Sequence, residues 1–510
     1  MTEAIPGWLD PLHDAAGMHA VDRWAIEERG IPGVELMERA GAGLARLVVD
    51  VAPEGEIAIV CGGGNNGGDG YVAARLLRQE GREVRVLATA DPARLKGDAA
   101  ANRDRLPGDG PRPFTPDGLV GAAVIVDAVL GTGFTGAPRE DVAAAIAAIN
   151  AAPAPVVAVD IPSGVDASTG MVAGEAVRAV ATATFAGPKA GLWIHPGKAH
   201  AGDVVVVDIG IPDGAPVTPA MGLIGPGAMA AYPSRGAAST KFESGHVLVA
   251  GGSRGLTGAV CLASMAAMRA GAGYVTACVP GALNDIFEVK LTEVMSAPLP
   301  DDGAAHTELG ADEVVERAGQ RGGVVVLGPG LGRTDGALAF AQRVAREVEV
   351  PLVLDADGLN AHAGRLEDLR DRRAPAILTP HGGELARLLE VGSDDVRARR
   401  LEAAREGARR SGAILLLKGD DTIVAEPEGR VGVSRGGSPA LATAGTGDVL
   451  SGVLAALLAR GMHPFDAACA GVFLHAEAGR RAALVLDGPD GVIAGDVIDE
   501  LPHTLDVERF

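Results

Sequence analysis

The chain has 510 residues, which is more than one hydrophobic core accommodates and predicts two or three domains. The formal net charge of −21 at pH 7, with no local cluster of lysine and arginine, argues against a nucleic-acid partner. The sequence shows no metal-ligand cysteine spacing, no signal peptide and no apolar run of membrane-spanning length, so we expect a cytoplasmic protein without a membrane partner.

The first half of the chain alternates apolar strands with segments of helix length. We predict helices at about 15–29 and 34–51, followed by the strand, glycine loop and helix of EIAIVCGGGNNGGDGYVAARLLRQEG. Five further strands are expected in REVRVLATA, AAVIVDAVLGTG, PVVAVDIPSG, ATATFAG and DVVVVDIGI. This alternation predicts a Rossmann-like, doubly wound α/β sheet that is mainly parallel.

Polar residues gather where three of these strands end. Residues 65–69 (NNGGD) follow the first strand, Asp127 closes another, and Asp160 with Ser163 follows a third. Ligands of doubly wound sheets bind beyond the carboxyl ends of the strands, so these groups predict a binding site. The loop GNNGGDG lacks the G-x-G-x-x-G spacing of a hydride-transferring dinucleotide site. Tight turns alone would explain its glycines but not the converging carboxylates.

Over about residues 15–211, GNNGGDG, DAVLGTG, VDIPSGVDASTG and FAGPKAGL resemble the epimerase domain of the bifunctional NAD(P)H-hydrate repair enzymes. The resemblance implies an isomerase that acts on hydrated NADH and NADPH. It implies that the hydrate contacts Asp160 and two loops, which comprise Asn65, Asn66, Gly67, Gly68, Asp69, Gly131, Thr132, Gly133, Phe134, Thr135, Gly136 and Ala137. It also implies a potassium ion lined by Asn66, Asp127 and Ser163, and all-oxygen ligands suit such a hard cation.

Epimerisation moves protons on and off the hydrate, so an acid and a base are needed. Asp160 is the first candidate for this role. Lys189, in the G-P-K stretch, is the second, although an exposed surface lysine would fit the sequence there equally well.

Residues 212–239 are dense in proline, glycine and alanine and have no sustained periodicity, which indicates a connector. We therefore predict a Rossmann-like epimerase domain at residues 1–217, a connector at 218–240 and a second domain at 241–510.

The second half again alternates strands and helices. It begins with the strand, glycine loop, helix and strand of GHVLVAGGSRGLTGAVCLASMAAMRAGAGYVTACVP. Further strands are expected in VVVLGPGLG, PLVLDADGLN, AILTPHGGE and AILLLKGDDTIVAEP, with helices near 337–346, 393–410 and 466–486. About 270 residues are enough for one α/β core.

The sequence TAGTGD, at residues 443–448, precedes an apolar helix that we predict at about 448–459. Glycines before a helix start let consecutive backbone N–H groups point at one spot, where the helix dipole favours negative charge, so this stretch predicts an anion cradle. The Asp448 carboxylate would compete with that anion unless it removes a proton from a hydroxyl during phosphoryl transfer. Alternatively, Asp448 only caps the helix.

Three more strand-end sequences accompany this cradle, namely GPGLG at 328–332, HGGE at 381–384 and KGDDT at 418–422. Each has a structural alternative, respectively a turn, a structural histidine and a hairpin with solvated carboxylates. Together, in this order and spacing, they resemble the ribokinase-like ADP/ATP-dependent NAD(P)H-hydrate dehydratases over about 241–500. HGGE departs from that family, in which a proline commonly follows the histidine.

This second resemblance implies a lyase that dehydrates the S epimer of the hydrate at the expense of an adenine nucleotide, ADP being favoured over ATP. The hydrate would contact Ala259, Gly330, His381 and Asp448. The nucleotide would contact Lys418, Gly419, Asp420, Asp421, Thr422 and Gly447. The family also implies a magnesium ion that bridges the nucleotide phosphates, and analogy suggests a homo-oligomer.

We therefore expect a bifunctional metabolite-repair enzyme. Deprotonation of the hydrate hydroxyl by Asp448 would allow its attack on a nucleotide phosphoryl group, and the resulting phosphate ester would leave with help from the ring-nitrogen lone pair. One alternative is a vitamin or sugar-alcohol kinase fused to a non-catalytic nucleotide-binding module. Another is that the first half binds the hydrate without turnover.

Overall fold

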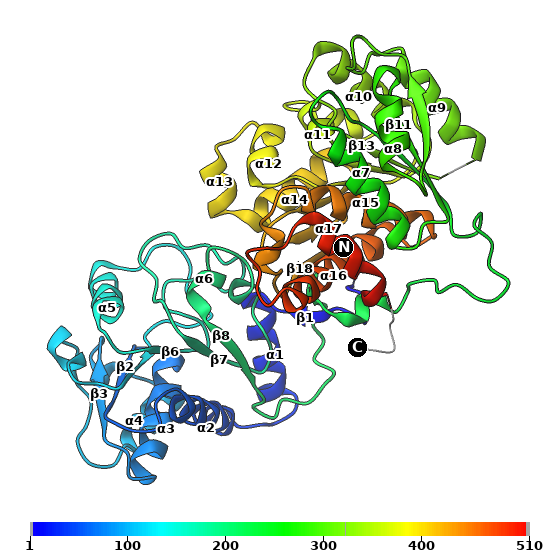
Figure 1. Cartoon of the computed structure of the whole chain (residues 1–510). Coiled ribbons are helices and arrows are strands. Elements are labelled where there is room, and N and C mark those ends of the chain that lie inside the picture. Colours follow the sequence, from blue (N-terminus) through cyan, green and yellow to red (C-terminus); the bar gives the residue numbers. More distant parts are fainter. Residues whose placement is uncertain (1–3, 322, 506–510) are drawn as a thin grey trace. The chain divides into compact units, whose positions relative to one another are not determined.

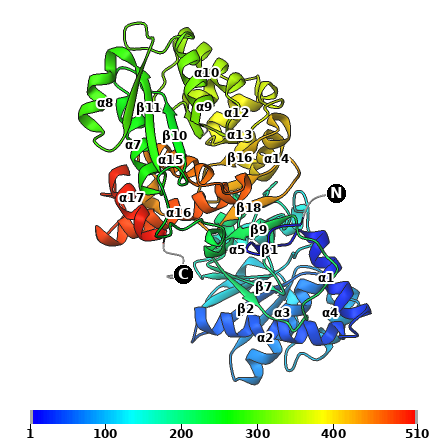
Figure 2. The ribbon, with the colours of Figure 1, turned by 90° about the vertical axis from the view of Figure 1, so that its right-hand side faces the viewer.

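The computed structural model describes residues 4–321 and 323–505. The chain forms two compact units, one of Pro11–Met221 and one that combines the chain up to Asp10 with the chain from Gly222 onward. Each unit contains one sheet flanked by helices (Figures 1 and 2).

The sheet of the first unit has seven strands in the order β4-β3-β2-β5-β6-β7-β8, and all neighbouring strands pair in parallel. These strands are β2 (Ile57–Cys61), β3 (Val84–Ala88), β4 (Arg112–Pro113), β5 (Val124–Ala128), β6 (Val156–Val159), β7 (Ala181–Phe185) and β8 (Asp203–Val207). The chain runs outward from β2 to β4 and then returns to β5 beside β2, so the switch point of this doubly wound sheet lies between β2 and β5. The sequence predicts every strand except β4, which has only two residues.

Helices cover both faces of this sheet. They are α1 (Ala15–Glu27), α2 (Gly33–Val51), α3 (Asn65–Gln79), α4 (Gly97–Asp104), α5 (Glu140–Ala151) and α6 (Lys198–Ala201), with short 3₁₀ turns η1 (Pro92–Arg94), η2 (Pro116–Leu119) and η3 (Ala190–Leu192). Ile57 and Ile59 share a core cluster with α2 and α3, whereas Ala58 and Val60 pack with α5 in a second cluster. Burial of both faces explains why these strands are continuous apolar runs.

The sheet of the second unit has eleven strands in the order β1-β9-β18-β17-β16-β15-β14-β13-β10-β11-β12. These strands are β1 (Asp10–Leu12), β9 (Met221–Ile224), β10 (His246–Ala250), β11 (Tyr274–Pro280), β12 (Met295–Leu299), β13 (Val324–Leu327), β14 (Leu352–Leu354), β15 (Ala376–Leu378), β16 (Ile414–Leu417), β17 (Ile423–Ala425) and β18 (Val431–Ser434). The run from β12 to β16 is parallel, and β16, β17 and β18 pair antiparallel. The carboxyl ends of β13 to β16 therefore share one edge.

The helices of this unit are α7 (Thr257–Arg269), α8 (Asn284–Lys290), α9 (Gly310–Arg321), α10 (Asp335–Glu347), α11 (Asp357–Asn360), α12 (Gly382–Leu389), α13 (Ser393–Ala398), α14 (Arg400–Ser411), α15 (Thr446–Ala459), α16 (Pro464–Val485) and α17 (Ala494–Glu500). Its 3₁₀ turns are η4 (Pro226–Met229), η5 (Gly281–Leu283), η6 (Leu366–Leu369), η7 (Pro439–Leu441) and η8 (Leu501–Thr504). The single helix predicted at 393–410 is two helices, because Arg399 between them has non-helical dihedrals of φ −133° and ψ 52°. Among the described residues, no helix is both long and apolar enough to cross a bilayer.

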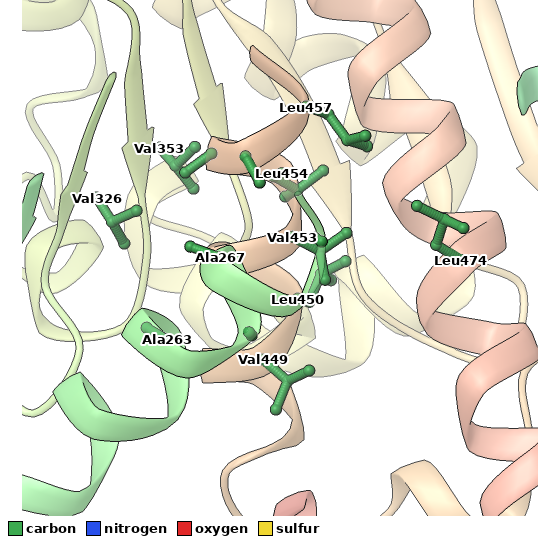
Figure 3. Close-up of a cluster of buried hydrophobic side chains, with 14 of the residues drawn as sticks. Ala263, Ala267, Val326, Val353, Val449, Leu450, Val453, Leu454, Leu457 and Leu474 are labelled. Atoms are coloured by element: carbon green, nitrogen blue, oxygen red, sulfur yellow. The ribbon is translucent and has the colours of Figure 1, made fainter. Parts of the chain in front are cut away.

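The apolar helix α15 lies in the core of the second unit. Figure 3 shows Val449, Val453 and Leu457 of this helix among side chains of α7, α16 and the sheet. Gly452 permits a close approach to α7, since a Cβ there would lie 2.1 Å from the Ala263 carbonyl oxygen. Each fully buried valine or leucine contributes roughly 1.5–3 kcal/mol, so this packing fixes the position of the helix and of the loop that begins it.

The two units divide the chain differently from the predicted ranges 1–217, 218–240 and 241–510. The predicted connector contains β9 and η4, and β9 belongs to the eleven-stranded sheet. The start of the chain also joins this unit, because Leu9 and Ile224 share its core and the Trp8 ring lies 6.4 Å from that of Phe465. These segments contain only three or four apolar residues within a stretch rich in proline and glycine, so the sequence shows no periodic pattern that would predict them.

Candidate active sites

A cavity of about 1240 Å³ opens at the carboxyl ends of the strands in the first unit. Many of the predicted contact residues line it, namely Asn65, Asn66, Asp69, Gly131, Thr132, Gly133, Phe134, Asp160 and Lys189. Gly67 and Gly68 do not line it, because they lie buried in the first turn of α3. Thr135, Gly136 and Ala137 are also outside the lining and are exposed farther along their loop.

The first turn of α3 faces this cavity with Asn65 and Asn66. The residue before the helix is Gly64, and no side chain caps the helix start. The first backbone N–H groups of α3 are therefore available to an anionic ligand, and the helix dipole favours negative charge there.

Asp160 and Lys189 form an ion pair on this cavity, with 2.6 Å between Lys189 Nζ and Asp160 Oδ1. Thr132 Oγ1 also donates to Asp160, and Lys189 donates to the Phe185 carbonyl at 2.7 Å. The Lys189 side chain is only 2% exposed, which excludes the surface-lysine alternative. Burial alone would raise the pKa of Asp160, but the ammonium of Lys189 and these hydrogen bonds lower it, so Asp160 is ionised.

Two further carboxyl groups line the same cavity. Asp22, on α1, makes no hydrogen bond within the described residues, and burial raises its pKa, with a further contribution from the Asp160 charge. Asp69 is 8% exposed, and burial together with Asp160 and Asp22 raises its pKa well above the ordinary value. The cavity thus holds one ionised carboxylate beside groups that retain protons more readily, which is the arrangement that acid–base chemistry requires. Sequence analysis misses Asp22 because it lies in a helix rather than after a strand.

The three residues predicted to line a potassium ion are brought together in the first unit. Asp127 is fully buried and accepts hydrogen bonds from Ser163 Oγ at 2.6 Å and from the Ser163 backbone N–H at 2.8 Å. Asn66 Nδ2 donates to the Leu130 carbonyl at 2.8 Å, and the Leu130 N–H donates to Ser163 Oγ at 2.8 Å.

Burial raises the pKa of Asp127 to about 6, although the hydrogen bonds from Ser163 and Val129 oppose this shift. No lysine or arginine pairs with Asp127 in the described part of the chain. A buried carboxylate surrounded by hydroxyl, amide and carbonyl oxygens fits a monovalent cation. Among the described residues there is no group of three or more His, Cys, Asp or Glu side chains suited to a transition metal.

In the second unit, three strand-end and helix residues meet at Asp355, which follows β14. Lys418 Nζ donates to Asp355 Oδ1 at 2.9 Å, and Thr379 Oγ1 donates to the same oxygen at 2.8 Å. Ser451 Oγ of α15 donates to Asp355 Oδ2 at 2.7 Å. Sequence analysis misses Asp355, although the sequence LDADG places a carboxylate after a strand as VDIPSG does for Asp160.

The predicted anion cradle begins α15. Gly445, with φ +92°, precedes the helix in a left-handed conformation, and no side chain caps the helix start. Asp448 is half-buried and makes no hydrogen bond within the described residues, so it is not the helix cap. Burial raises the pKa of Asp448 to about 7, the Asp355 carboxylate adds to the shift, and Lys418 opposes it. A carboxylate that titrates near neutrality is suited to general-base catalysis.

Ala259 and Gly330 are neighbours in the structure. Gly330 has φ +61°, and a Cβ there would lie 3.1 Å from that of Ala259 and 2.4 Å from the Leu256 carbonyl oxygen. The first turn of α7 and the loop after β13 therefore pack together, and a glycine is required at their contact.

His381 has a structural role at the start of α12. Its Nδ1 accepts hydrogen bonds from the N–H groups of Gly383 and Glu384 at 3.0 and 3.3 Å, and Glu384 Oε2 accepts one from the His381 N–H at 2.9 Å. This is a capping box, which sequence analysis keeps open as the structural alternative. The ring remains exposed, with its Nε2 3.5 Å from Glu384 Oε1.

The sequence KGDDT forms the predicted tight turn between β16 and β17. Asp421 is not solvated, because its carboxylate is 1% exposed and pairs with Arg400 at 2.8 Å. Thr422 Oγ1 donates to the Gly419 carbonyl at 2.6 Å, and Asp420 Oδ1 accepts from the Gly437 N–H at 3.2 Å. Any ligand contact at Asp421 would therefore involve its backbone and not its carboxylate.

The fold and these groups define an α/β enzyme with two separate strand-end sites, one a cavity with buried carboxyl groups and the other an anion cradle beside a lysine. A family model described as NAD(P)H-hydrate dehydratase matches residues 247–502, and one described as YjeF-related protein N-terminus matches residues 33–191. The chain belongs to the family of bifunctional NAD(P)H-hydrate repair enzymes. This membership confirms the resemblance and the Rossmann-like and ribokinase-like classes predicted from the sequence.

Two relatives match nearly the whole chain. The bifunctional NAD(P)H-hydrate repair enzyme Nnr of Salinibacter ruber is 40% identical over 98% of this chain and 97% of its own length. The enzyme of the same name from Moorella thermoacetica is 41% identical over 97% and 96%, respectively. Among solved structures, the ADP/ATP-dependent NAD(P)H-hydrate dehydratase of Bacillus subtilis, co-crystallised with ATP and Mg²⁺, is 28% identical and covers 55% of this chain and 96% of its own, with a TM-score of 0.48.

Proposed function

We propose that the chain repairs hydrated NADH and NADPH in two steps. The unit of Pro11–Met221 interconverts the R and S hydrates, and the other unit dehydrates the S hydrate to NAD(P)H with consumption of an adenine nucleotide, ADP in preference to ATP. The observation that carries the proposal is the presence, in one chain, of a cavity with the Asp160–Lys189 pair and a separate cradle with Asp448. Family membership favours this function over the kinase alternative.

In the dehydration, Asp448 is the base that takes the proton of the hydrate hydroxyl. The hydroxyl oxygen then forms a bond to the terminal phosphoryl group of the nucleotide, whose bond to the remaining nucleotide breaks. The phosphate ester leaves the ring carbon with the electrons of the C–O bond, and loss of a ring proton restores the dihydronicotinamide. The backbone N–H groups that begin α15 and the ammonium of Lys418 stabilise the charge on the transferred group.

In the epimerisation, the ionised Asp160 and the buried Lys189 form one proton-transfer pair on the cavity wall. Asp22, whose pKa is raised mainly by burial, supplies a second group that can hold a proton. Asp160 remains the first candidate for the base and Lys189 the second. The N–H groups that begin α3 would bind the hydrate's phosphates.

Two cations belong to this proposal. Asn66, Asp127 and Ser163 would hold potassium, whose charge would neutralise Asp127 beneath the loop after β5. Magnesium would accompany the nucleotide at the cradle, where it would neutralise phosphate charge. A cytoplasmic location and a homo-oligomeric state are further parts of the proposal.

A single assay tests the proposed function. A mixture of R and S NADPH hydrate is incubated with the full chain and either ADP or ATP, and reduced nicotinamide is followed by absorbance. Full recovery of NADPH with release of inorganic phosphate is expected, because epimerisation feeds the R hydrate into dehydration. Recovery of only the S fraction would contradict the epimerase assignment, and a stable phosphorylated product would favour the kinase alternative.

A further inference from the structure

The carboxylate of Asp355 has no assigned role, although it lies next to the groups proposed for dehydration. It is 2% exposed, and both of its oxygens are engaged. Lys418 and Thr379 donate to Oδ1, and Ser451 donates to Oδ2. Four elements meet at this one side chain, since Asp355 follows β14 and its donors follow β15, follow β16 or belong to α15.

We infer that Asp355 is a positioning residue for the dehydration, which holds the Lys418 ammonium at the cradle and keeps it from pairing with Asp448. The inference rests on the proposed function of this site. Lys418 Nζ lies beside the cradle, since a Cβ at Gly447 would be 3.5 Å from it. Ser451 fixes Asp355 relative to Asp448. Its hydroxyl donates to Asp355, and it belongs to α15, the helix that carries Asp448.

The charges explain why such a residue is needed. A half-buried lysine without its own counter-ion next to Asp448 would pair with it, and an opposite charge within a few ångströms lowers the pKa of a carboxyl group. A base whose pKa has been lowered is a weaker base. With Asp355 present, Lys418 has its own counter-ion. The pKa of Asp448 then stays raised to about 7 by burial and by the Asp355 charge, so Asp448 remains a stronger base.

Two other titratable groups face Lys418. Glu384 contributes to its charge environment but is engaged in the cap of α12. His475 of α16 is buried, and burial lowers its pKa to about 4, so it is neutral through the pH range in which Asp448 titrates. Neither group can substitute for the Asp355 carboxylate.

The test compares Asp355→Asn with Lys418→Met in the full chain, using pure S NADPH hydrate and saturating ADP. The pH dependence of kcat is measured. Asp355→Asn keeps the shape and one acceptor oxygen but frees Lys418 to pair with Asp448, so the acid limb of the profile should move about one unit lower. Displacement of the ammonium should also reduce kcat, by up to about a hundredfold. Lys418→Met removes the cation, so its acid limb should move in the opposite direction.

The inference is supported if Asp355→Asn lowers the limb much more when Lys418 is present than in the Lys418→Met background, because loss of the Asp355 charge alone lowers the limb in both. Equal shifts in the two backgrounds would overturn it. An unshifted limb in Asp355→Asn, or a shift of the Asp355→Asn and Lys418→Met limbs in one direction, would also overturn it. If Asp355→Asn does not fold, the double variant Asp355→Asn/Lys418→Met leaves no unpaired charge, and its limb should lie less than about one unit below that of Lys418→Met, since no ammonium remains to pair with Asp448. A limb about one unit or more below that of Lys418→Met would then refute the inference, because Asp355 would act on Asp448 without Lys418.

The proposed function fails in a distinguishable way. If Asp448→Asn dehydrates the S hydrate as fast as the wild type does, the base assignment is wrong and the role of Asp355 loses its basis. If Asp448→Asn is inactive and Asp355→Asn retains the wild-type rate and profile, only the inference about Asp355 is wrong. Glu426→Gln is the matched control, because it neutralises another buried carboxylate of this unit, the partner of Arg430.

Discussion

The buried pair of Asp160 and Lys189 makes a quantitative prediction for the variant Lys189→Met. Methionine keeps the length and apolar stem of lysine, but among the described residues it leaves the Asp160 carboxylate with only Thr132 and a long 3.4 Å contact from the Phe185 N–H. Removing one partner of a buried ion pair costs about 3–5 kcal/mol. The lower end applies here, because the Asp160 side chain is 14% exposed to the cavity. A loss of about 3 kcal/mol corresponds to a fall of about 6–12 °C in the Tm of a unit this size.

The pH dependence of this loss has a definite sign. In the wild type, the pKa of Asp160 is lowered, so its contribution to stability is present above the unfolded-state pKa and is lost as pH falls through the folded-state value. In Lys189→Met, the ammonium charge no longer offsets the effect of burial on the pKa of Asp160. That pKa therefore rises above its ordinary value. The folded variant then gains stability as Asp160 takes up a proton. The difference in stability should be largest at neutral and alkaline pH and should narrow on acidification.

Amide hydrogen exchange followed by mass spectrometry is the suitable assay, because it reports the first unit separately from the second. Epimerisation should be abolished, whereas dehydration of pure S hydrate should continue.

Arg112→Met is the matched control, since it breaks an exposed pair in which Arg112 is 65% and Asp109 78% exposed. This change should cost under about 1 kcal/mol. Asp160→Asn added to Lys189→Met should restore most of the lost stability. Equal losses in Lys189→Met and Arg112→Met, or a difference that widens toward acid pH, would refute the reasoning.

Three further predictions concern the two sites. The dehydration rate should rise with pH with a midpoint near 7, because Asp448 acts as a base only when ionised and its pKa is raised to about 7. A flat rate from pH 5 to 8 in the wild type would contradict this. Asp448→Asn should abolish dehydration and spare epimerisation. Asp22→Asn should slow epimerisation about a hundredfold, as measured by chromatographic separation of the two epimers, and should not affect dehydration of S hydrate. An unchanged half-life of the epimers would remove Asp22 from the mechanism. Replacing potassium with tetramethylammonium should slow wild-type epimerisation but not that of Asp127→Asn, whereas equal sensitivity of the two proteins would place the cation elsewhere.

Much of both sites could be predicted from the rule that polar residues after parallel strands converge on one edge. The rule finds Asp127 and Asp160 in the first unit, and the glycines before an apolar helix identify the cradle at Asp448. The same rule would also have found Asp355, which follows β14 in the sequence LDADG. The sequence alone does not single it out, because a carboxylate that is buried beside a lysine has the same sequence pattern as one in a solvated turn.

Other features depend on tertiary structure alone. Asp22 reaches the cavity because α1 packs beside it, and a single acidic residue in an amphipathic helix gives no sign of that. The break at Arg399 divides a stretch whose residues all favour helix. The capping role of His381 depends on the direction in which its ring turns, which the sequence HGGE leaves open.

The first unit is an insertion in the chain of the second, because residues before Pro11 and after Met221 both belong to the eleven-stranded sheet and its core. A protease that cuts once near residue 236 would therefore divide the polypeptide without releasing a complete dehydratase half. The amino-terminal fragment would keep Trp8 and Leu9, and these would hold it on the remainder of the second unit without a covalent link. Separation of the two fragments would require denaturant, and a dehydratase expressed from residue 241 onward would lack β1, β9 and their share of the core.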